Sequence, residues 1–374
     1  MVKRIFITAS AVLMLFGCSA KSGGSTEKAA SQGRQLELKY AKQFSAEYLD
    51  NGCTRVSIGD DDYLVVPENA DVPADTNGDI IIKQPVLNVY NAASSAMDLI
   101  DGAGAFDHVS MTSTKYDDWS LPAVRNAMDS GALTYVGKYS APDYEAILES
   151  DCGLAIESTM IYHSPEVKEK LEALGVPVLV ERSSYESDPL GRMEWIKLYG
   201  IIFGCEEQTE KFFDEKTKQL ESILLDEKSG KTAAFFYINS SGGVVVRKPA
   251  DYVPEMIRMA GGEYIFNADD LNTDENSLST MTIQPESFYE KAWDADVLIY
   301  NSTIAGEVST VDELLEKFPL LSDFSAVKSS DVWCTEKNMF QQTTGAADMI
   351  AELHSIFTGE AKSKMYFIYR LEDK

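Results

Sequence analysis

Short apolar runs rich in β-branched residues alternate with helical patterns along most of the chain. Such alternation is typical of parallel sheets covered by helices. The pattern occurs twice, once on each side of residue 205. The predicted strands are residues 80–82 with 86–90, 133–136, 154–156 and 178–180 in the first half, and 233–238, 244–246, 297–300 and 332–334 in the second.

A single helix is predicted between the two halves, over residues 206–227. Phe213, Leu220 and Leu224 recur there at helical spacing and form one apolar stripe, and Gly230 follows as a stop. At 1.5 Å per residue this helix would be roughly 33 Å long, about the width of a small domain. The predicted fold class is therefore α/β, with two lobes of mostly parallel sheet joined by one long backbone helix.

The N-terminal part of the first half departs from this pattern. Residues 40–69 predict an added β-hairpin, because the apolar stretches 56–58 and 63–66 flank an acidic turn at 59–62. The first strand of the lobe itself would then lie near residues 86–90.

The N-terminus predicts export. Lys3 and Arg4 precede an apolar run, residues 5–16, that is too short to span a bilayer as a mature helix. A charged start, a short apolar stretch and a break are typical of a signal peptide, here residues 1–17. The break resembles a bacterial lipobox, which implies that Cys18 is lipidated and anchors the chain to the outer face of the cell membrane.

Length and composition then divide the chain. Residues 18–36 are mostly small and polar, and predict a flexible, lipid-anchored tether. The rest exceeds the size at which one core usually splits into two. The predicted boundaries are 37–204 for an N-terminal α/β lobe with the added hairpin, 205–229 for the connecting helix and 230–374 for a C-terminal α/β lobe.

The formal net charge of −27 repels phosphate backbones, so no nucleic acid partner is expected. Strong net charge also suits a soluble exported protein. Beyond Cys18 the chain has Cys53, Cys152, Cys205 and Cys334, which are far apart and lack metal-binding spacing. Export permits a disulfide among them, and the sequence leaves its pairing open.

Candidate ligand-binding residues follow the predicted strands, because ligands of such folds bind at the carboxyl ends of parallel strands. Aromatic rings there would stack on a planar or apolar ligand, and cations would meet carboxylates or catecholates. Trp119 also suits a covering role, and Arg182 an ion pair with Glu181 or Glu186. The candidates are Tyr116, Trp119, Glu157, Ser158, Arg182 and Tyr185 in the first lobe, and Arg247, Lys248, Asn301 and Gln341 in the second.

Five stretches carry a likeness to a known family. They are GKYSAPDYEAIL at 137–148, DCGLAI at 151–156, LEALGVPV at 171–178, a segment ending in GGEYIF at 257–266, and a segment from QPESF to DVLI at 284–299. In order and spacing they resemble the helical-backbone class of ABC-transporter substrate-binding proteins, which bind iron–siderophores, haem and cobalamin. The resemblance covers about residues 80–358.

The resemblance implies a solute-binding component of an ABC importer, with permease subunits and a cognate ATPase as partners. Its cargo would be a metal chelate: a ferric siderophore, haem or a cobamide. By motif position, Glu145 and Glu286 would dock on the permease, although both also suit an ordinary helix start. A monomer without a cofactor or catalytic activity is expected.

Two other functions stay open. A related class binds bare zinc or manganese with three His and a carboxylate, and this chain has His108, His163 and His354, none of which follows a predicted strand. A surface hydrolase would use Glu157 and Glu181, at neighbouring strand ends, as an acid–base pair. No nucleophile elbow, P-loop or HExxH motif accompanies them.

Overall fold

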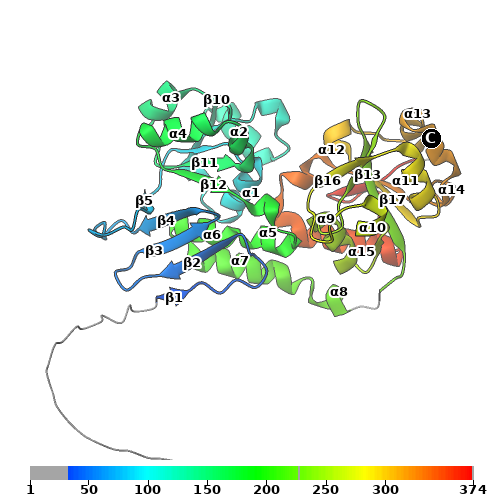
Figure 1. Cartoon of the computed structure of the whole chain (residues 1–374), viewed down its shortest axis with the longest axis horizontal. Coiled ribbons are helices and arrows are strands. Elements are labelled where there is room, and N and C mark those ends of the chain that lie inside the picture. The colour runs from blue at the N-terminus through cyan, green and yellow to red at the C-terminus, as the bar shows by residue number, and fades with distance from the viewer. Residues whose placement is uncertain (1–32, 226–227, 373–374) are drawn as a thin grey trace, which may run out of the picture. The chain divides into compact units, whose positions relative to one another are not determined.

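The computed structural model describes residues 33–225 and 228–372 (Figure 1). The expected signal peptide, Cys18 and all but the last residues of the expected tether lie outside the described residues. The chain from Gly33 onwards forms one compact unit. Within the described residues, no helix is long and apolar enough to cross a membrane.

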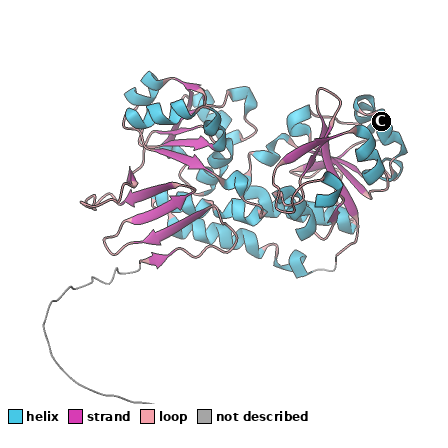
Figure 2. Cartoon of the chain, in the orientation of Figure 1, coloured by secondary structure: helices cyan, strands magenta, loops and turns pink. Residues whose placement is uncertain are grey.

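The first lobe is built on a five-stranded sheet that is parallel throughout. Its order, β12-β11-β6-β7-β8, reverses direction between β6 and β11, and the carboxyl ends of strands beside such a reversal form the usual ligand crevice. Helices pack on this sheet (Figure 2). The elements are β6 (Val89–Asn91), α1 (Ser94–Gly102), β7 (Val109–Thr112), α2 (Pro122–Ser130), β8 (Thr134–Tyr135), α3 (Tyr144–Glu149), β11 (Ala155–Ser158), α4 (Pro165–Ala173) and β12 (Val178–Glu181), with a small ribbon of β9 (Gly137–Lys138) and β10 (Ala141–Pro142).

One strand of this sheet was missed in the sequence. In β7 only Val109 and Met111 are apolar, and they alternate with Ser110 and Thr112, so the run lacks the continuous apolar character of its neighbours. Thr112 is nevertheless fully buried, because β7 lies between β6 and β8.

A separate five-stranded sheet precedes this lobe, in the order β1-β2-β3-β4-β5. Strands β3 and β4 pair antiparallel where the hairpin was expected. The predicted strand at 80–82 does not join the sheet of the first lobe; it pairs with β4 instead. The strands are β1 (Arg34–Gln35), β2 (Phe44–Tyr48), β3 (Thr54–Ile58), β4 (Asp61–Val66) and β5 (Ile80–Lys83).

The second lobe holds a seven-stranded mixed sheet. Strands β13, β17 and β18 are parallel and central, and β14, β16 and β19 run antiparallel to their neighbours. The four strands predicted for this half are all present. They are β13 (Thr232–Ile238), β14 (Val244–Arg247), β17 (Val297–Tyr300) and β18 (Val332–Thr335), and the others are β15 (Glu263–Tyr264), β16 (Thr280–Ile283) and β19 (Ile368–Arg370).

The helices of the second lobe cover this sheet (Figure 2). They are α9 (Tyr252–Met259), α10 (Ala268–Leu271), α11 (Pro285–Ala292), α12 (Ser302–Ala305), α13 (Val311–Lys317), α14 (Ser325–Lys328) and α15 (Ala346–Thr358). The predicted α/β class with parallel sheets is confirmed.

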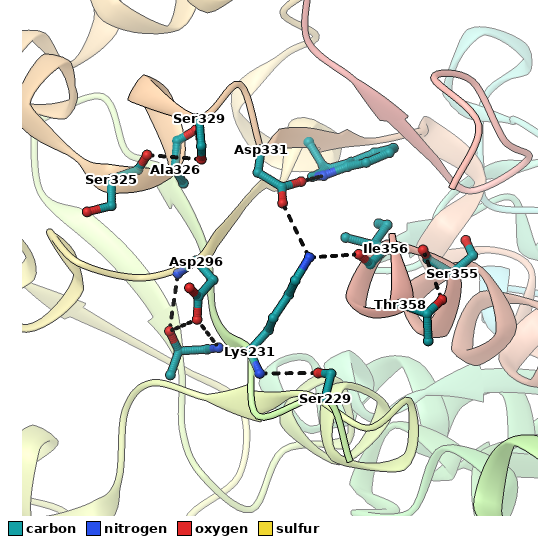
Figure 3. A network of polar contacts seen from close by, with 12 residues as sticks. Ser229, Lys231, Asp296, Ser325, Ala326, Ser329, Asp331, Ser355, Ile356 and Thr358 are labelled. Atoms are coloured by element: carbon teal, nitrogen blue, oxygen red, sulfur yellow. Dashed lines mark hydrogen bonds and ion pairs between the residues drawn. The ribbon is translucent and has the colours of Figure 1, made fainter. Parts of the chain in front are cut away.

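A polar network fixes the amino ends of the three parallel strands of the second lobe (Figure 3). The Asp296 carboxylate accepts hydrogen bonds from the amide and the hydroxyl of Thr232. The Lys231 ammonium lies 3.8 Å from the Asp331 carboxylate and 3.5 Å from the carbonyl oxygen of Ile356. These contacts tie β13, β17, β18 and α15 together at the edge opposite the strand carboxyl ends.

The link between the lobes differs from the predicted rod. The segment holds two helices, α7 (Glu206–Lys218) and α8 (Glu221–Leu225), and residues 226–227 lie outside the described range. The Thr217 hydroxyl donates to the carbonyl of Phe213, and the Leu220 amide bonds to Thr217 in a tighter turn. Side-chain competition of this kind interrupts helices. Two short helices, α5 (Pro189–Glu194) and α6 (Ile196–Phe203), precede this link.

The two lobes share one hydrophobic core. A single cluster of buried side chains includes Ile156 and Leu179 of the first sheet together with Phe235, Ile299 and Trp333 of the second. Further clusters cover the outer faces of each sheet. The lobes are therefore joined by packing as well as by the chain that links them.

Candidate functional site

A cavity of about 510 Å³ is lined by both lobes. The first lobe contributes residues that follow β11 and β12, and α5 contributes Arg192. The second lobe contributes residues around the end of β14 and the start of α9. Its volume falls in the range of sites for small molecules. The lining residues are Thr159, Ser184, Tyr185, Arg192, Arg247, Asp251, Tyr252, Leu278, Ser279 and Phe340.

Two guanidinium groups in this cavity lie against aromatic rings. Arg192 sits 3.9 Å from the ring centroid of Tyr252. Arg247 sits 4.9 Å from the centroid of Phe340 and 5.6 Å from that of Tyr252. Ring faces hold cations without neutralising them, so both groups keep their charge for a ligand.

The single carboxylate in the cavity lining is largely committed to the protein. Asp251 accepts hydrogen bonds from the amides of Val253 and Ser279, and its contact with Arg247 is long, at 3.5 Å. Desolvation lowers the pKa of Arg247, but the electrostatic effects of Tyr252 and Asp251 outweigh it and leave the pKa raised. The cavity therefore combines aromatic surface with an excess of positive charge.

Two of the predicted ligand-binding residues line this cavity. Tyr185 follows β12 and is 39% exposed, which leaves its ring available to a ligand. Arg247 ends β14, but this strand runs antiparallel to β13, so the rule for the carboxyl ends of parallel strands does not explain its place in the lining. Lys248, next to it, is half-buried and is not part of the lining.

The predicted aromatic pair Tyr116 and Trp119 lies elsewhere. Trp119 is 1% exposed and belongs to the hydrophobic core, where its indole nitrogen donates to the carbonyl of Thr114. Tyr116 is exposed, and its hydroxyl lies 3.3 Å from the Asp129 carboxylate. The covering role is therefore the correct one for Trp119.

Three other predicted residues are used locally. The Ser158 hydroxyl accepts a hydrogen bond from the Met160 amide, and Asn301 caps α12 while being 1% exposed. Arg182 stacks over the ring of Tyr185 at 5.0 Å and lies against Gly59, where an added Cβ would collide with its guanidinium. Arg182 thus contacts the lining residue Tyr185 but is not part of the lining.

Gln341, also predicted as a ligand residue, joins the two lobes instead. Its side-chain oxygen accepts from the amide of Ser120 at 2.7 Å, and its side-chain nitrogen donates to the carbonyl of Asp118 at 2.7 Å. The oxygen and the nitrogen of the Gln341 side-chain amide are therefore both bonded to the backbone of the first lobe.

The residues that follow Gln341 continue this contact. The Thr343 hydroxyl donates to the carbonyl of Ser95, and the Thr344 amide donates to the Asp98 carboxylate at 2.7 Å. Burial raises the pKa of Asp98 to about 6, although the hydrogen bonds from Thr344 oppose that shift. We call Gln341, Thr343 and Thr344 the inter-lobe clasp.

The two carboxylates of the hydrolase hypothesis point to opposite faces of their sheet. Register pairs Glu157 with Val180 and Ser158 with Glu181. Glu157 therefore shares the face of Val180, while Glu181 shares that of Leu179, and the two faces pack into different clusters. The predicted acid–base pair does not form.

Glu157 is itself unusual. It is fully buried, and neither carboxylate oxygen has a hydrogen-bond partner in the described chain. Burial alone raises its pKa to about 8. By contrast, the Glu181 carboxylate accepts from the amide of Ser183 and lies 3.3 Å from the hydroxyl of Ser95.

The histidines do not assemble a metal site. His108 lies 2.6 Å from the carbonyl of Val86 and His354 lies 3.0 Å from that of Ala260, while His163 is exposed. Among the described residues, no three His, Cys, Asp or Glu side chains gather closely enough to hold a metal ion. Cys53, Cys152, Cys205 and Cys334 are free thiols.

The proposed docking residues both occupy exposed first turns. Glu145 follows the Asp143 cap of α3, and Glu286 follows Pro285 at the start of α11. Figure 1 shows α3 in the first lobe and α11 in the second. Each lobe thus presents one carboxylate at the positive end of a helix.

Comparison with known proteins identifies the family. A family model described as periplasmic binding protein matches residues 89–338, more than half of the chain. The chain belongs to this family of solute-binding proteins. The fold with two α/β lobes and a cavity between them agrees with that assignment.

Two relatives are named uncharacterized lipoproteins of Methanocaldococcus jannaschii. One is 26% identical over 68% of this chain, and the matched region spans 61% of that relative. The other is 26% identical over 81% of this chain and 78% of the relative.

Solved structures of similar fold include a periplasmic binding protein from Veillonella parvula, with a TM-score of 0.61, 15% identity, and 86% of this chain and 99% of that chain covered. A periplasmic haem-binding protein of Vibrio cholerae has a TM-score of 0.57 and 17% identity, with 71% and 97% covered. A periplasmic vitamin B12-binding protein of the same organism has a TM-score of 0.51 and 17% identity, with 73% and 96% covered.

Several lining residues had no clear signal in the sequence. Arg192 lies on α5 and Tyr252 in the first turn of α9, so neither follows a strand. Asp251 caps α9, and Ser279 comes from the loop before β16.

Glu157 predicts a specific pH dependence of stability. A carboxyl whose pKa is higher in the folded chain binds its proton more tightly there, so its contribution to the unfolding free energy falls as the pH rises from about 4.5 to about 8, by up to about 1.4 kcal/mol per pH unit. Glu157→Gln should flatten that part of the curve in chemical denaturation at several pH values. The exposed control Glu145→Gln should keep the original slope, and equal slopes in all three proteins would contradict the prediction.

The clasp predicts a local effect of Gln341→Ala. Loss of the two inter-lobe hydrogen bonds should lower the unfolding free energy by about 1–2 kcal/mol and speed hydrogen exchange at the Ser120 amide. Gln342→Ala is the matched control, because Gln342 contacts Asn338 of its own lobe. Unchanged exchange at Ser120 would show that the clasp does not hold the lobes.

Proposed function

We propose that this protein is the extracytoplasmic solute-binding component of an ABC importer, and that it captures a metal chelate in the cavity between its lobes. A ferric siderophore, haem or a cobamide is the proposed cargo. The observation that carries this proposal is the pairing of two guanidinium groups with aromatic rings in one cavity shared by both lobes.

The chemistry of the lining supports a chelate with acidic groups. Ring faces such as those of Tyr185 and Phe340 suit a flat ligand, and Arg192 and Arg247 suit carboxylates or catecholates. Among proteins of similar fold, two bind haem and vitamin B12 by their names, which agrees with a large ring-shaped cargo. Of the three proposed cargoes, the positive cavity favours those that carry negative charge.

Delivery would use the two exposed carboxylates. Glu145 and Glu286 would meet basic groups of the permease subunits, and the cognate ATPase would drive transport. Exposed ion pairs contribute little affinity but set orientation and association rate. Cys18, through its lipid, would keep the protein, as a monomer, on the outer face of the cell membrane, and the lipoprotein names of the two relatives support this.

The other two functions have less support. The hydrolase lacks its pair, because Glu157 and Glu181 lie on opposite faces of the sheet. A bare zinc or manganese site has no cluster of ligands among the described residues. The family assignment and the similar folds are those of binding proteins.

The cargo is tested by a thermal-shift screen with haem, cobalamin, cobinamide, several ferric siderophores, zinc and manganese. A ligand at a hundredfold its dissociation constant should add about 2.7 kcal/mol to the unfolding free energy. We expect a shift with one chelate and none with free metals. A shift with zinc or manganese alone would contradict the proposal.

The arginines should control affinity for that chelate. Arg192→Gln and Arg247→Gln each remove one charged donor, so calorimetry should show affinity lowered by about ten- to a hundredfold. Lys248→Gln, which removes a charge beside the cavity but outside its lining, is the matched control. Equal affinity in all four proteins would place the ligand elsewhere.

The docking carboxylates should affect transport and not capture. The double variant Glu145→Lys and Glu286→Lys should abolish importer-dependent uptake in cells while leaving ligand affinity unchanged, because both residues lie on exposed helix starts away from the cavity. Glu149→Lys with Glu290→Lys reverses charge at exposed positions of the same helices and should leave uptake largely intact. Normal uptake by the Glu145→Lys and Glu286→Lys double variant would show that these residues do not dock on the permease.

A further inference from the structure

The N-terminal sheet is attached to the rest of the chain by an unusual contact. Residues 39–43, which we call the strap, run between β1 and β2 outside regular secondary structure. All five strap amides donate to just two buried carboxylates. The first three amides lie 2.8 to 3.0 Å from Glu194, and the last two lie 2.8 to 3.0 Å from Glu186.

Each carboxylate also has a partner from the body of the protein. The Trp195 indole nitrogen donates to Glu186 at 3.0 Å, and the Lys197 ammonium contacts Glu194 at 3.0 Å. Glu194 is fully buried and Glu186 is 3% exposed. A carboxylate this deeply buried persists when hydrogen bonds satisfy its oxygens, and the strap amides supply most of them here.

These two carboxylates lie beside cavity residues in the chain. Glu186 directly follows Tyr185, and Glu194 is two residues after Arg192 on the short helix α5. The strap also packs flush against α5, because a Cβ at Gly191 would lie 3.0 Å from the carbonyl oxygen of Tyr40. The strap therefore contacts the back of the wall whose front faces the ligand cavity.

The same sheet supports Tyr185 at a second point. The turn between β3 and β4 places Gly59 against the Arg182 guanidinium, which in turn lies 5.0 Å from the ring centroid of Tyr185. The β2 residue Phe44 meets Trp195 edge-on at 4.9 Å, next to Glu194. Strap, turn and strand thus contact both segments that carry the first-lobe part of the cavity.

We propose that Glu186 and Glu194, by binding the strap, are positioning residues of the ligand cavity, and that the N-terminal sheet is part of the ligand site. The family match begins at residue 89, so this sheet lies outside the matched region and would adapt the cavity to a particular cargo. A six-residue helix such as α5 has little stability of its own and takes its position from what it packs against. The inference of a ligand rests on the proposed function, whereas the positioning of Arg192 can be tested without it.

The test compares Glu186→Gln, Glu194→Gln and Gly191→Ala in the full chain. The Gln variants keep the shape but weaken the bonds to the strap amides, and Gly191→Ala presses α5 away from the strap without changing charge. Asp296→Asn is the matched control, because Asp296 also accepts from a backbone amide but lies at the amino ends of the second-lobe strands (Figure 3).

The first readout needs no ligand. The rate of arginine modification by phenylglyoxal is measured peptide by peptide, and we expect Arg192, which is 8% exposed, to react several-fold faster in the three variants. Arg247, held in the second lobe by Asp251 and Phe340, is the internal control and should react at its original rate. An unchanged Arg192 rate in folded variants, as judged by circular dichroism, would overturn the proposal. If a Gln variant fails to fold, the rate of Arg192 modification in Gly191→Ala decides whether the strap positions Arg192.

The second readout uses haemin as the probe, followed by absorbance titration. We expect each variant to bind about tenfold more weakly than the original protein, and Asp296→Asn to bind equally well. Faster Arg192 modification with no haemin binding by the original protein would support the positioning role and count against haem as cargo. Faster modification with unaltered haemin affinity would overturn the claim that the sheet is part of the ligand site.

Discussion

The hydrogen bonds of the inter-lobe clasp are the constraint on which the ligand cavity depends. Residues of both lobes line the cavity. Its width therefore depends on the distance between the lobes. The clasp sets this distance through the paired amide contacts of Gln341 and the bond from Thr344 to the buried Asp98. The shared hydrophobic cluster supports it, because separating the lobes would expose apolar side chains to water.

This arrangement replaces the rigid rod expected between the lobes. The linking segment is interrupted after Lys218, so a single stiff helix does not set their spacing. Packing and a few directed hydrogen bonds do so instead. These contacts hold the two walls of the cavity in place within the chain itself.

Hydrogen bonds to backbone amides satisfy three of the buried carboxylates described above, and Glu157 differs from them. Glu186, Glu194 and Asp251 are buried, and each accepts several backbone amides, which offsets the cost of removing a carboxylate from water. Arg192 and Arg247 are held by aromatic rings and keep their charge toward the cavity. Glu157 alone among these acids lacks such partners, and its raised pKa is the physical consequence.

The sequence by itself determined the class of fold and two of the residues that line the cavity between the lobes. Apolar strand runs and helix starts are local signals, so most strands, the β3–β4 pair and the strand-end positions of Tyr185 and Arg247 could be predicted from them. Only the tertiary structure decided which polar residues reach the cavity. Trp119 and Gln341 both follow strands, yet one enters the core and the other binds the opposite lobe. Arg192 and Tyr252 reach the cavity from helices, because two lobes distant in sequence bring them together. The strap could not be predicted from the sequence, because it binds through backbone amides, which nearly every residue has. Only the folded chain shows that these five amides meet the carboxylates of Glu186 and Glu194.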